Sequence, residues 1–235
     1  MVLVGTRNPL NIGAAARAMS NFGFSTLRVV KPYPAAFREA RSAVGAGQVL
    51  AAAEVYKTVA EAVADCTLVV GATAVRNRTL HHPLHRLELG ARLIRKRLGS
   101  SQVALLFGSE KFGLTNEALS HCHWLMRIQT AEQNISMNLG QAVAVCLYEL
   151  VRELKSAAMT EKTALAAAGE IERITQMLLE ALDRSGFLDR RKVADADERI
   201  RRVVRRLRIP ASDVKVWLGM LRQILWKLGQ PAKPE

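Results

Sequence analysis

Three short polar segments in the first 140 residues carry side chains that could do chemistry. In the first, Asn11, Gly13 and Arg17 follow the spacing Asn-x-Gly-x-x-x-Arg, and the residues between Gly13 and Arg17 are alanines. Asn11 is expected to cap a helix, while glycine and alanine allow another backbone to approach closely. A guanidinium with such small neighbours can be buried against a phosphate or a partner surface. Arg17 is therefore the first candidate functional residue.

The second and third polar segments each follow an apolar run. In the second, Gly108, Glu110 and Gly113 place two glycines five positions apart, which indicates either backbone held against a ligand or a plain turn. In the third, Ser136 and Asn138 precede an apolar helical pattern, where they can bind a ligand or simply cap the helix. Each segment alone leaves both interpretations open.

The spacing of other candidate motifs excludes two familiar chemistries. Leu114 and Thr115 follow Gly113 where a phosphate-binding P-loop requires Lys and then Ser or Thr. Two groups of residues contain metal-capable atoms, but neither has the four-ligand spacing of a structural zinc site. These groups are His81, His82 and His85, and His121, Cys122 and His123. We therefore predict no metal site.

Hydrophobic patterning indicates the elements that position the three segments. Up to about residue 155, short aliphatic runs alternate with helical patterns, which is typical of an α/β fold with a parallel sheet. The predicted strands are residues 2–4, 26–31, 67–71, 103–107 and 124–128, and the predicted helices include residues 11–21, 35–44, 84–98, 115–119 and 138–153. Ligands of such sheets bind at the carboxyl ends of the strands, so the three segments should gather there.

The C-terminal part of the chain has a different pattern, with helices and no strand. We predict an α/β domain at residues 1–155, a linker at 156–164 and a helical domain at 165–235. Its helices are expected near residues 165–185, 196–207 and 211–228, and the second carries Arg199, Arg201, Arg202, Arg205, Arg206 and Arg208. This arginine cluster is either a solvated face of a small helical bundle or a phosphate-contacting face.

Composition narrows the class of protein. The 34 Lys and Arg against 21 Asp and Glu give a net charge of +13, which favours a polyanionic partner, nucleic acid before anionic membrane. Apolar runs fall short of the ~20 residues of a spanning helix, and the first residues lack a signal-peptide layout. Three widely spaced cysteines form neither a disulfide framework nor a metal knuckle. We expect a cytoplasmic protein with no membrane partner.

Together, the three segments resemble the motifs of the SPOUT superfamily of RNA methyltransferases, in its SpoU/TrmH branch. The matches are Asn11, Gly13 and Arg17 to N-x-G-x-x-x-R, residues 108–114 to G-x-E-x-x-G-L, and residues 136–139 to S-[LM]-N-[LV]. Nearly the whole chain, including FGSEKFGLTNEAL and LLEALDRSGFLDRR, is similar to branch members that methylate the 2′-hydroxyl at position 32 of the tRNA anticodon loop. Ser109, where those members commonly have Arg, and Gln129, where many relatives have Pro, depart from the pattern.

The resemblance implies S-adenosylmethionine as the cofactor, a C-terminal trefoil knot within the first domain, and a homodimer whose active site forms across the subunit interface. The cofactor would lie among the loops after the strands, with Ile128, Ile135 and Met137 packing the adenine. The implied cofactor-binding residues are Thr73, Ala74, Val75, Gly108, Ile128, Ile135, Ser136, Met137 and Asn138.

The resemblance also implies which residues act on the RNA. Arg17 is the principal catalytic residue, supplied by the neighbouring subunit. A guanidinium stays protonated, so we favour stabilisation of the developing alkoxide over proton removal. Glu110 is the alternative base, or it orients Arg17 or caps a loop. The candidate RNA-binding residues are Arg7, Arg76, Arg78, Lys111, Arg201 and Arg205.

Three other functions compete with a tRNA 2′-O-methyltransferase. A ribosomal RNA methyltransferase of the same branch would share every catalytic motif, but it would carry an N-terminal substrate-binding domain in place of the helical C-terminal part. A non-catalytic RNA-binding protein on this scaffold would be expected to lose Arg17 or the cofactor loops. A DNA-binding regulator would need a recognition helix, and no convincing helix-turn-helix precedes Arg199. Which tRNAs and which nucleotides are accepted stays open.

Overall fold

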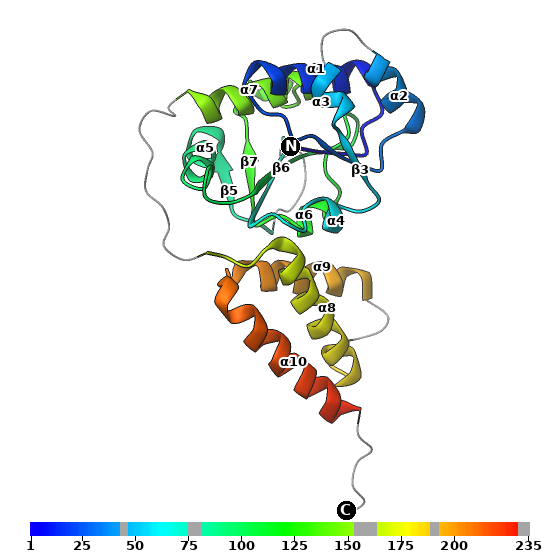
Figure 1. Ribbon diagram of the computed structural model, residues 1–235, viewed down its shortest axis with the longest axis vertical. Coiled ribbons are helices and arrows are strands. Elements are labelled where there is room, and N and C mark those ends of the chain that lie inside the picture. Colours follow the sequence, from blue (N-terminus) through cyan, green and yellow to red (C-terminus); the bar gives the residue numbers. More distant parts are fainter. Residues whose placement is uncertain (43–46, 75–80, 153–163, 189–192, 230–235) are drawn as a thin grey trace, which may run out of the picture.

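A parallel sheet of seven strands forms the centre of the protein (Figure 1). The computed structural model describes residues 1–42, 47–74, 81–152, 164–188 and 193–229. In sheet order the strands are β3 (Glu54–Tyr56), β2 (Arg28–Val30), β1 (Val2–Val4), β6 (Val103–Phe107), β4 (Leu68–Ala72), β7 (Trp124–Arg127) and β5 (Leu84–Arg86). Every neighbouring pair is parallel. The predicted α/β fold with a parallel sheet is confirmed, and each predicted strand is present.

The two edge strands, β3 and β5, were not predicted. Each is three residues long and mostly exposed, so neither shows the buried apolar run that marks a central strand. Residues 84–86, assigned to a helix from their sequence, form β5, and the helix α5 (Leu87–Arg95) begins only after them.

Helices cover both faces of the sheet (Figure 1). One core packs the sheet against α1 (Pro9–Asn21), α2 (Pro34–Ser42), α3 (Gly47–Ala51), α5 and α7 (Leu139–Val151). The other packs it against α4 (Val59–Ala62) and α6 (Asn116–Ser120). Successive residues of β6 enter the two cores alternately, Leu105 on the first face and Leu106 on the second. Burial on both faces explains why the central strands are apolar throughout.

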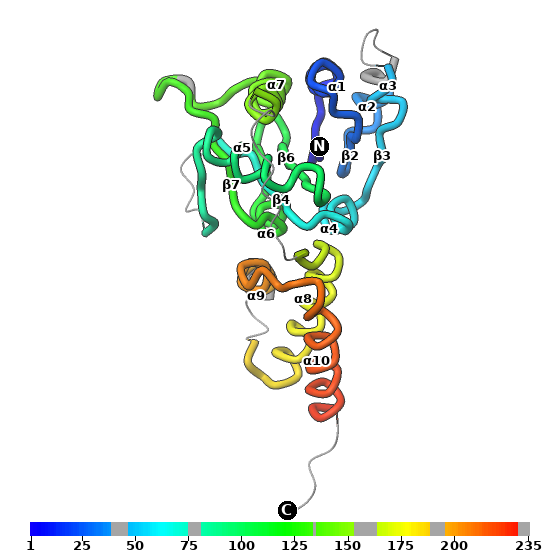
Figure 2. The backbone as a smooth tube through the Cα atoms, turned by 60° about the vertical axis from the view of Figure 1, so that its left-hand side comes forward, coloured from blue at the N-terminus to red at the C-terminus, as the bar shows by residue number. Residues whose placement is uncertain are grey.

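Three further helices follow the sheet and form what we call the helical tail, residues 164–229 (Figure 2). They are α8 (Ala168–Arg184), α9 (Val193–Arg206) and α10 (Val214–Leu228), with a 3₁₀ turn, η4 (Ala211–Asp213), before the last. Ile174, Val204 and Leu221 belong to a core of the tail's own. In the part of the chain that the structure describes, no helix is both long and apolar enough to cross a membrane.

The helical tail packs against α4 and α6, on the face of the sheet opposite α1 and α7 (Figures 1 and 2). At the start of α8, the Ala168 N–H donates to the Cys66 carbonyl and the Gly169 N–H to the Ala64 carbonyl, both at 2.6 Å. A Cβ at position 169 would lie 2.9 Å from the Ala64 carbonyl oxygen, so only glycine permits this approach without a shift.

Candidate active site

The three polar segments meet where β1, β6 and β7 end. The Asn11 side chain donates from Nδ2 to Oε1 of Glu110 at 3.1 Å, and Asn138 donates from Nδ2 to Oδ1 of Asn11 at 2.7 Å. We call Asn11, Glu110 and Asn138 the loop junction. It joins residues that lie 99 and 127 positions apart in the sequence.

Asn11 does not cap α1, as its sequence position suggested. The helix begins at Pro9, and Asn8 is the cap, its side chain accepting a hydrogen bond from the Leu10 N–H at 2.9 Å. Proline is favoured at the first position of a helix because it has no N–H to satisfy and its φ is already helical. Asn11 therefore lies inside the first turn and is buried, which leaves both ends of its amide for the loop junction.

Glu110 stabilises the start of α1. Its carboxylate accepts hydrogen bonds from the backbone N–H of Arg7 at 3.3 Å and of Asn8 at 3.2 Å, besides the one from Asn11. A carboxylate at this end of a helix also interacts favourably with the helix dipole. Of the roles considered for Glu110, capping a loop is the one that these contacts describe.

Arg17 is exposed on α1. The small residues around it pack the helix and, contrary to expectation, do not bury the guanidinium. Ala15 and Ala16 are buried in the core between α1 and the sheet. A Cβ at Gly140, in α7, would lie 2.5 Å from the Cβ of Ala14, so small residues bring α1 and α7 into close contact. The alanines thus pack the helix, and the side chain of Arg17 is not buried among them.

The loop after β6 is a rigid turn. The Gly113 N–H donates to the Ser109 carbonyl at 2.8 Å, and the Phe112 N–H donates to Oγ of Ser109 at 3.3 Å. Gly113 has a φ of +68°, and a Cβ at Gly108 would lie 2.0 Å from the carbonyl carbon of Gly113. Both glycines are therefore required by the turn itself. Ser109, a departure from the family pattern, fixes the turn with its side chain.

A cavity of about 300 Å³ opens between this turn and the segment before α7. Its lining includes the expected cofactor residues Thr73, Ala74, Gly108, Ile128, Ile135, Ser136 and Met137. Two expected residues differ. Val75 lies outside the described residues. Asn138 caps α7, its Oδ1 accepting hydrogen bonds from the N–H groups of Gly140 and Gln141 at 2.9 and 3.4 Å.

Sequence reasoning missed part of the cavity wall. The wall also contains Glu110 and Lys111, which the sequence suggested in other roles, and five residues of the motif segments: Ser109, Phe112, Gly113, Leu114 and Leu139. The lining residues not singled out from the sequence are Ala72, Phe107, Met126, Thr130 and Ala142. Ala72, Phe107 and Met126 lie at or near the carboxyl ends of β4, β6 and β7, so the topology rule that located the site could have named them. Thr130 had no such signal.

The residues expected to bind RNA lie in different environments. Arg7 and Lys111 are exposed beside the loop junction, whereas Arg76 and Arg78 lie outside the described residues. Arg201 and Arg205 are buried, with 9% and 2% of their surface exposed, so the structure moves them from the expected RNA surface to the interior.

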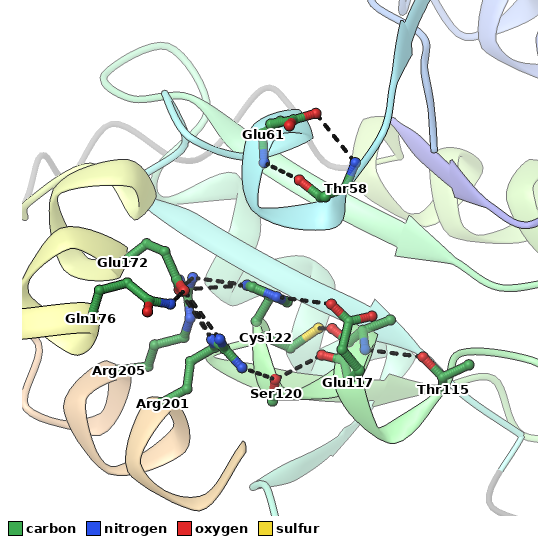
Figure 3. A network of polar contacts seen from close by, with 12 residues as sticks. Thr58, Glu61, Thr115, Glu117, Ser120, Cys122, Glu172, Gln176, Arg201 and Arg205 are labelled. Carbon is green, nitrogen blue, oxygen red and sulfur yellow. Dashed lines mark hydrogen bonds and ion pairs between the residues drawn. The ribbon is translucent and has the colours of Figure 1, made fainter. Parts of the chain in front are cut away.

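Arg201 and Arg205 belong to a buried polar cluster that holds the helical tail against α6 (Figure 3). Arg201 donates to both carboxylate oxygens of Glu172 at 3.1–3.2 Å and to Oγ of Ser120 at 3.3 Å. Nη2 of Arg205 lies 3.7 Å from Oε2 of Glu172 and 3.4 Å from Nδ1 of His121. We call these five residues the tail socket.

One partly buried carboxylate, Glu172, serves two buried guanidinium groups in the tail socket. Burial raises the pKa of Glu172, but hydrogen bonds from Arg201 and Gln176 outweigh it and hold the pKa below its usual value. Burial lowers the pKa of Arg205 to about 10, although Glu172 opposes this. Glu172 is therefore the counter-charge that stabilises Arg205 as a buried cation.

The histidines and Cys122 do not gather into a metal site. Within the described residues, no group of three or more potential ligands could hold a metal ion. His123 accepts a hydrogen bond through Nδ1 from the Val69 N–H at 3.0 Å, and burial together with Arg205 lowers its pKa to about 3. His123 is therefore a neutral acceptor for the Val69 N–H of β4, directly before the first residue of β7.

A parallel α/β sheet with a small-molecule cavity where its strands end is the architecture of a cofactor-dependent enzyme. Residues 1–148 match the model of the SpoU rRNA Methylase family, and the chain belongs to this family. S-adenosylmethionine is accordingly its cofactor.

Relatives that are named for a specific reaction match nearly the full chain. The chain is 36% identical to the tRNA (cytidine/uridine-2′-O-)-methyltransferase TrmJ of Sodalis glossinidius, over 95% of this chain and 90% of the relative. The TrmJ of Salmonella typhimurium is 34% identical, with 95% of each chain covered. The crystal structure of TrmJ from Z. mobilis superposes with a TM-score of 0.81 at 31% identity, covering 95% of this chain and 97% of the other.

The cavity suits S-adenosylmethionine. Its volume falls within the range of small-molecule sites, and its wall mixes apolar side chains such as Ile128 and Met137 with a few polar groups. Oγ1 of Thr130 is buried and, among the described residues, has no hydrogen-bond partner. A buried hydroxyl in this state is costly unless a ligand bonds to it. Thr130 is thus a residue that would bind the cofactor.

Proposed function

We propose that this protein is an S-adenosylmethionine-dependent tRNA 2′-O-ribose methyltransferase that acts at position 32 of the anticodon loop. The observation that carries the proposal is the loop junction, which brings all three family motifs together beside the cavity. Similarity to tRNA methyltransferases over 95% of the chain, including the helical tail, supports tRNA over ribosomal RNA. Such a substrate is consistent with a cytoplasmic protein.

The protein's part in this reaction is mainly alignment. When bound, the cofactor supplies an activated methyl group on a sulfonium. The loop junction fixes the start of α1 and the turn after β6, which border the place where the ribose would lie. Holding the 2′-hydroxyl in line with the methyl carbon removes much of the entropic barrier. The guanidinium of Arg17 would stabilise negative charge on the attacking oxygen.

Arg17 can serve this role if a second copy of the chain supplies it. Leu10, Ala14 and Arg17 are exposed at helical spacing on one side of α1, and Leu10 is 77% exposed. Tyr148, on the neighbouring helix α7, is 52% exposed. An exposed apolar stripe next to the site supports a homodimer across α1 and α7. The proposal includes the trefoil knot that the family resemblance implies.

We assign the helical tail as the RNA-binding domain, joined to the α/β domain of residues 1–155 by a linker at 156–164. With Arg201 and Arg205 buried, the exposed arginines Arg199, Arg206 and Arg208 carry the proposed phosphate contacts. Burial and the charges of Arg202 and Arg206 lower the pKa of His82 to about 4, which indicates a positive field between α9 and the loop before β5.

The test is methyl transfer from radiolabelled S-adenosylmethionine to unmodified tRNA transcripts, with the labelled nucleotide mapped. We expect label at ribose 32, none on a transcript with 2′-deoxyribose there, and a loss of at least about 100-fold in Arg17→Ala. Arg92→Ala, at an exposed arginine of α5, is the matched control and should behave as wild type. Label on ribosomal RNA alone would show that ribosomal RNA, and not tRNA, is the substrate. Label on neither RNA would overturn the proposal.

A further inference from the structure

One exposed aromatic side chain lies at the cavity. Among the described residues, the exposed aromatic side chains are Tyr33, Phe112, Tyr148, Phe187 and Trp226. Of these, only Phe112 lines the cavity, and it is 61% exposed. The other aromatic residue of the wall, Phe107, is 3% exposed and belongs to the core. Phe112 therefore provides the exposed aromatic surface at the cavity.

Phe112 is held where it is by the turn after β6. Its own N–H is bonded to Ser109, and the next residue, Gly113, bonds to the Ser109 carbonyl. The same turn carries Glu110, which is anchored to the start of α1. The backbone at Phe112 is thus fixed relative to both the cavity and the loop junction. A ring carried on a fixed backbone loses less conformational entropy when a second ring stacks on it than a ring on a mobile loop would.

A positive charge accompanies the ring. Nζ of Lys111 lies 5.2 Å from the centroid of Phe112, within the range of a cation–π contact, and Lys111 also lines the cavity. An apolar ring beside an ammonium group matches a nucleotide, whose base stacks on aromatic faces and whose phosphate seeks a cation.

We propose that Phe112 is a specificity-determining residue on which the base of the methylated nucleotide stacks, with Lys111 at an adjacent phosphate. The inference rests on the proposed function and specifies how that site takes its substrate. Stacking fixes the base and thereby the orientation of its ribose toward the cavity, which in-line methyl transfer requires. Every base has a face that stacks, so this platform selects an unpaired nucleotide and accepts cytidine and uridine alike.

The test compares two transcripts that differ only at the mapped target nucleotide, one intact and one with an abasic site that keeps its 2′-hydroxyl. We would measure kcat/KM for both with wild type, Phe112→Leu, Phe112→Trp and the control Phe187→Leu, an exposed phenylalanine of the tail. For wild type, Phe112→Trp and Phe187→Leu, loss of the base should lower kcat/KM at least about fivefold. For Phe112→Leu, the two transcripts should be methylated at similar rates.

Three results would overturn the inference while leaving the proposed function standing. One is a Phe112→Leu enzyme that still discriminates fully against the abasic transcript. Another is a loss of S-adenosylmethionine affinity in Phe112→Leu, measured by equilibrium binding, that equals its loss of kcat/KM. This result would place the ring on the cofactor. The third is a change in oligomeric state by sedimentation, which would place it in a subunit contact. Absence of methyl transfer by wild type to any transcript would instead overturn the proposed function and this inference with it.

Discussion

The loop junction and the tail socket are both small polar clusters between distant segments, but they differ in charge and burial. The loop junction joins two amides to one carboxylate, and Glu110 itself is exposed. The tail socket places two guanidinium groups, 9% and 2% exposed, around the carboxylate of Glu172, whose side chain is 16% exposed. The first aligns loops at a cavity, and the second attaches a whole set of helices.

This difference predicts which substitutions should lower stability and which should lower activity. A hydrogen bond at an exposed carboxylate can be replaced by water at small cost, so the loop junction contributes more to alignment than to folding. A buried cation that loses its partner cannot be rehydrated without opening the structure. Substitutions in the tail socket should therefore unfold or detach the tail, whereas those in the loop junction should slow methyl transfer in a folded protein.

The largest expected effect is from Glu172→Leu. Removal of this carboxylate leaves Arg201 and Arg205 buried without a counter-charge, which should lower the free energy of unfolding by about 3–5 kcal/mol in urea denaturation. The control is Glu180→Leu, also on α8, whose side chain is 47% exposed and pairs with Arg184. It should change stability by less than about 1 kcal/mol. Equal effects of the two substitutions would contradict a special role for the tail socket.

Glu110→Gln should have an intermediate effect, confined to activity. The amide keeps the size of the carboxylate but loses the charge that three donors share, so kcat/KM should fall about tenfold with the melting temperature unchanged. Glu132→Gln, at an exposed carboxylate of the 3₁₀ turn η1 (Glu132–Asn134), is the control. A loss above about 1,000-fold, with the acidic limb of the pH–rate profile removed, would show that Glu110 is the catalytic base after all.

The smallest expected effect is the contribution of His123 to the pH dependence of stability. His123 is neutral in the folded protein because its pKa is lowered to about 3 from an ordinary 6.5. The unfolded chain therefore binds a proton first on acidification, and the stabilisation present above pH 6.5 is lost progressively between pH 6.5 and 3. Between pH 7 and 5.5 the loss should be about 1 kcal/mol. In urea denaturation, His123→Gln should remove this part of the slope, and an unchanged slope would refute the assignment.

The parts of the fold that were predictable depend on local pattern, and the parts that were not depend on partners far away in sequence. The buried runs of β1, β4 and β6 and the capping of α7 by Asn138 are visible in a few adjacent residues. The edge strand β5 has no buried face to give it a pattern.

The candidate RNA-binding residues Arg201 and Arg205 were misplaced for the same reason, because their partners are far away in sequence. Arg201 and Arg205 lie on the face of α9 that carries the buried Val204, but a run of arginines reads as a solvated surface unless its counter-charge is known. That counter-charge, Glu172, is 29 residues away from Arg201, and Ser120 is 81 residues away. By contrast, the motif loops could be placed because parallel strands bring their ends to one edge whatever the sequence between them.

The segment 108–121 belongs to both clusters, with Glu110 near its start, Ser120 and His121 at its end, and α6 between. This has a consequence for how the protein can be recombined. A chimera cut only between residues 152 and 164 would separate the tail from Ser120 and His121, because these two residues of the tail socket belong to the α/β part of the chain. The tail and α6 therefore form one packing unit, and an exchange of tails between relatives must carry this short helix along.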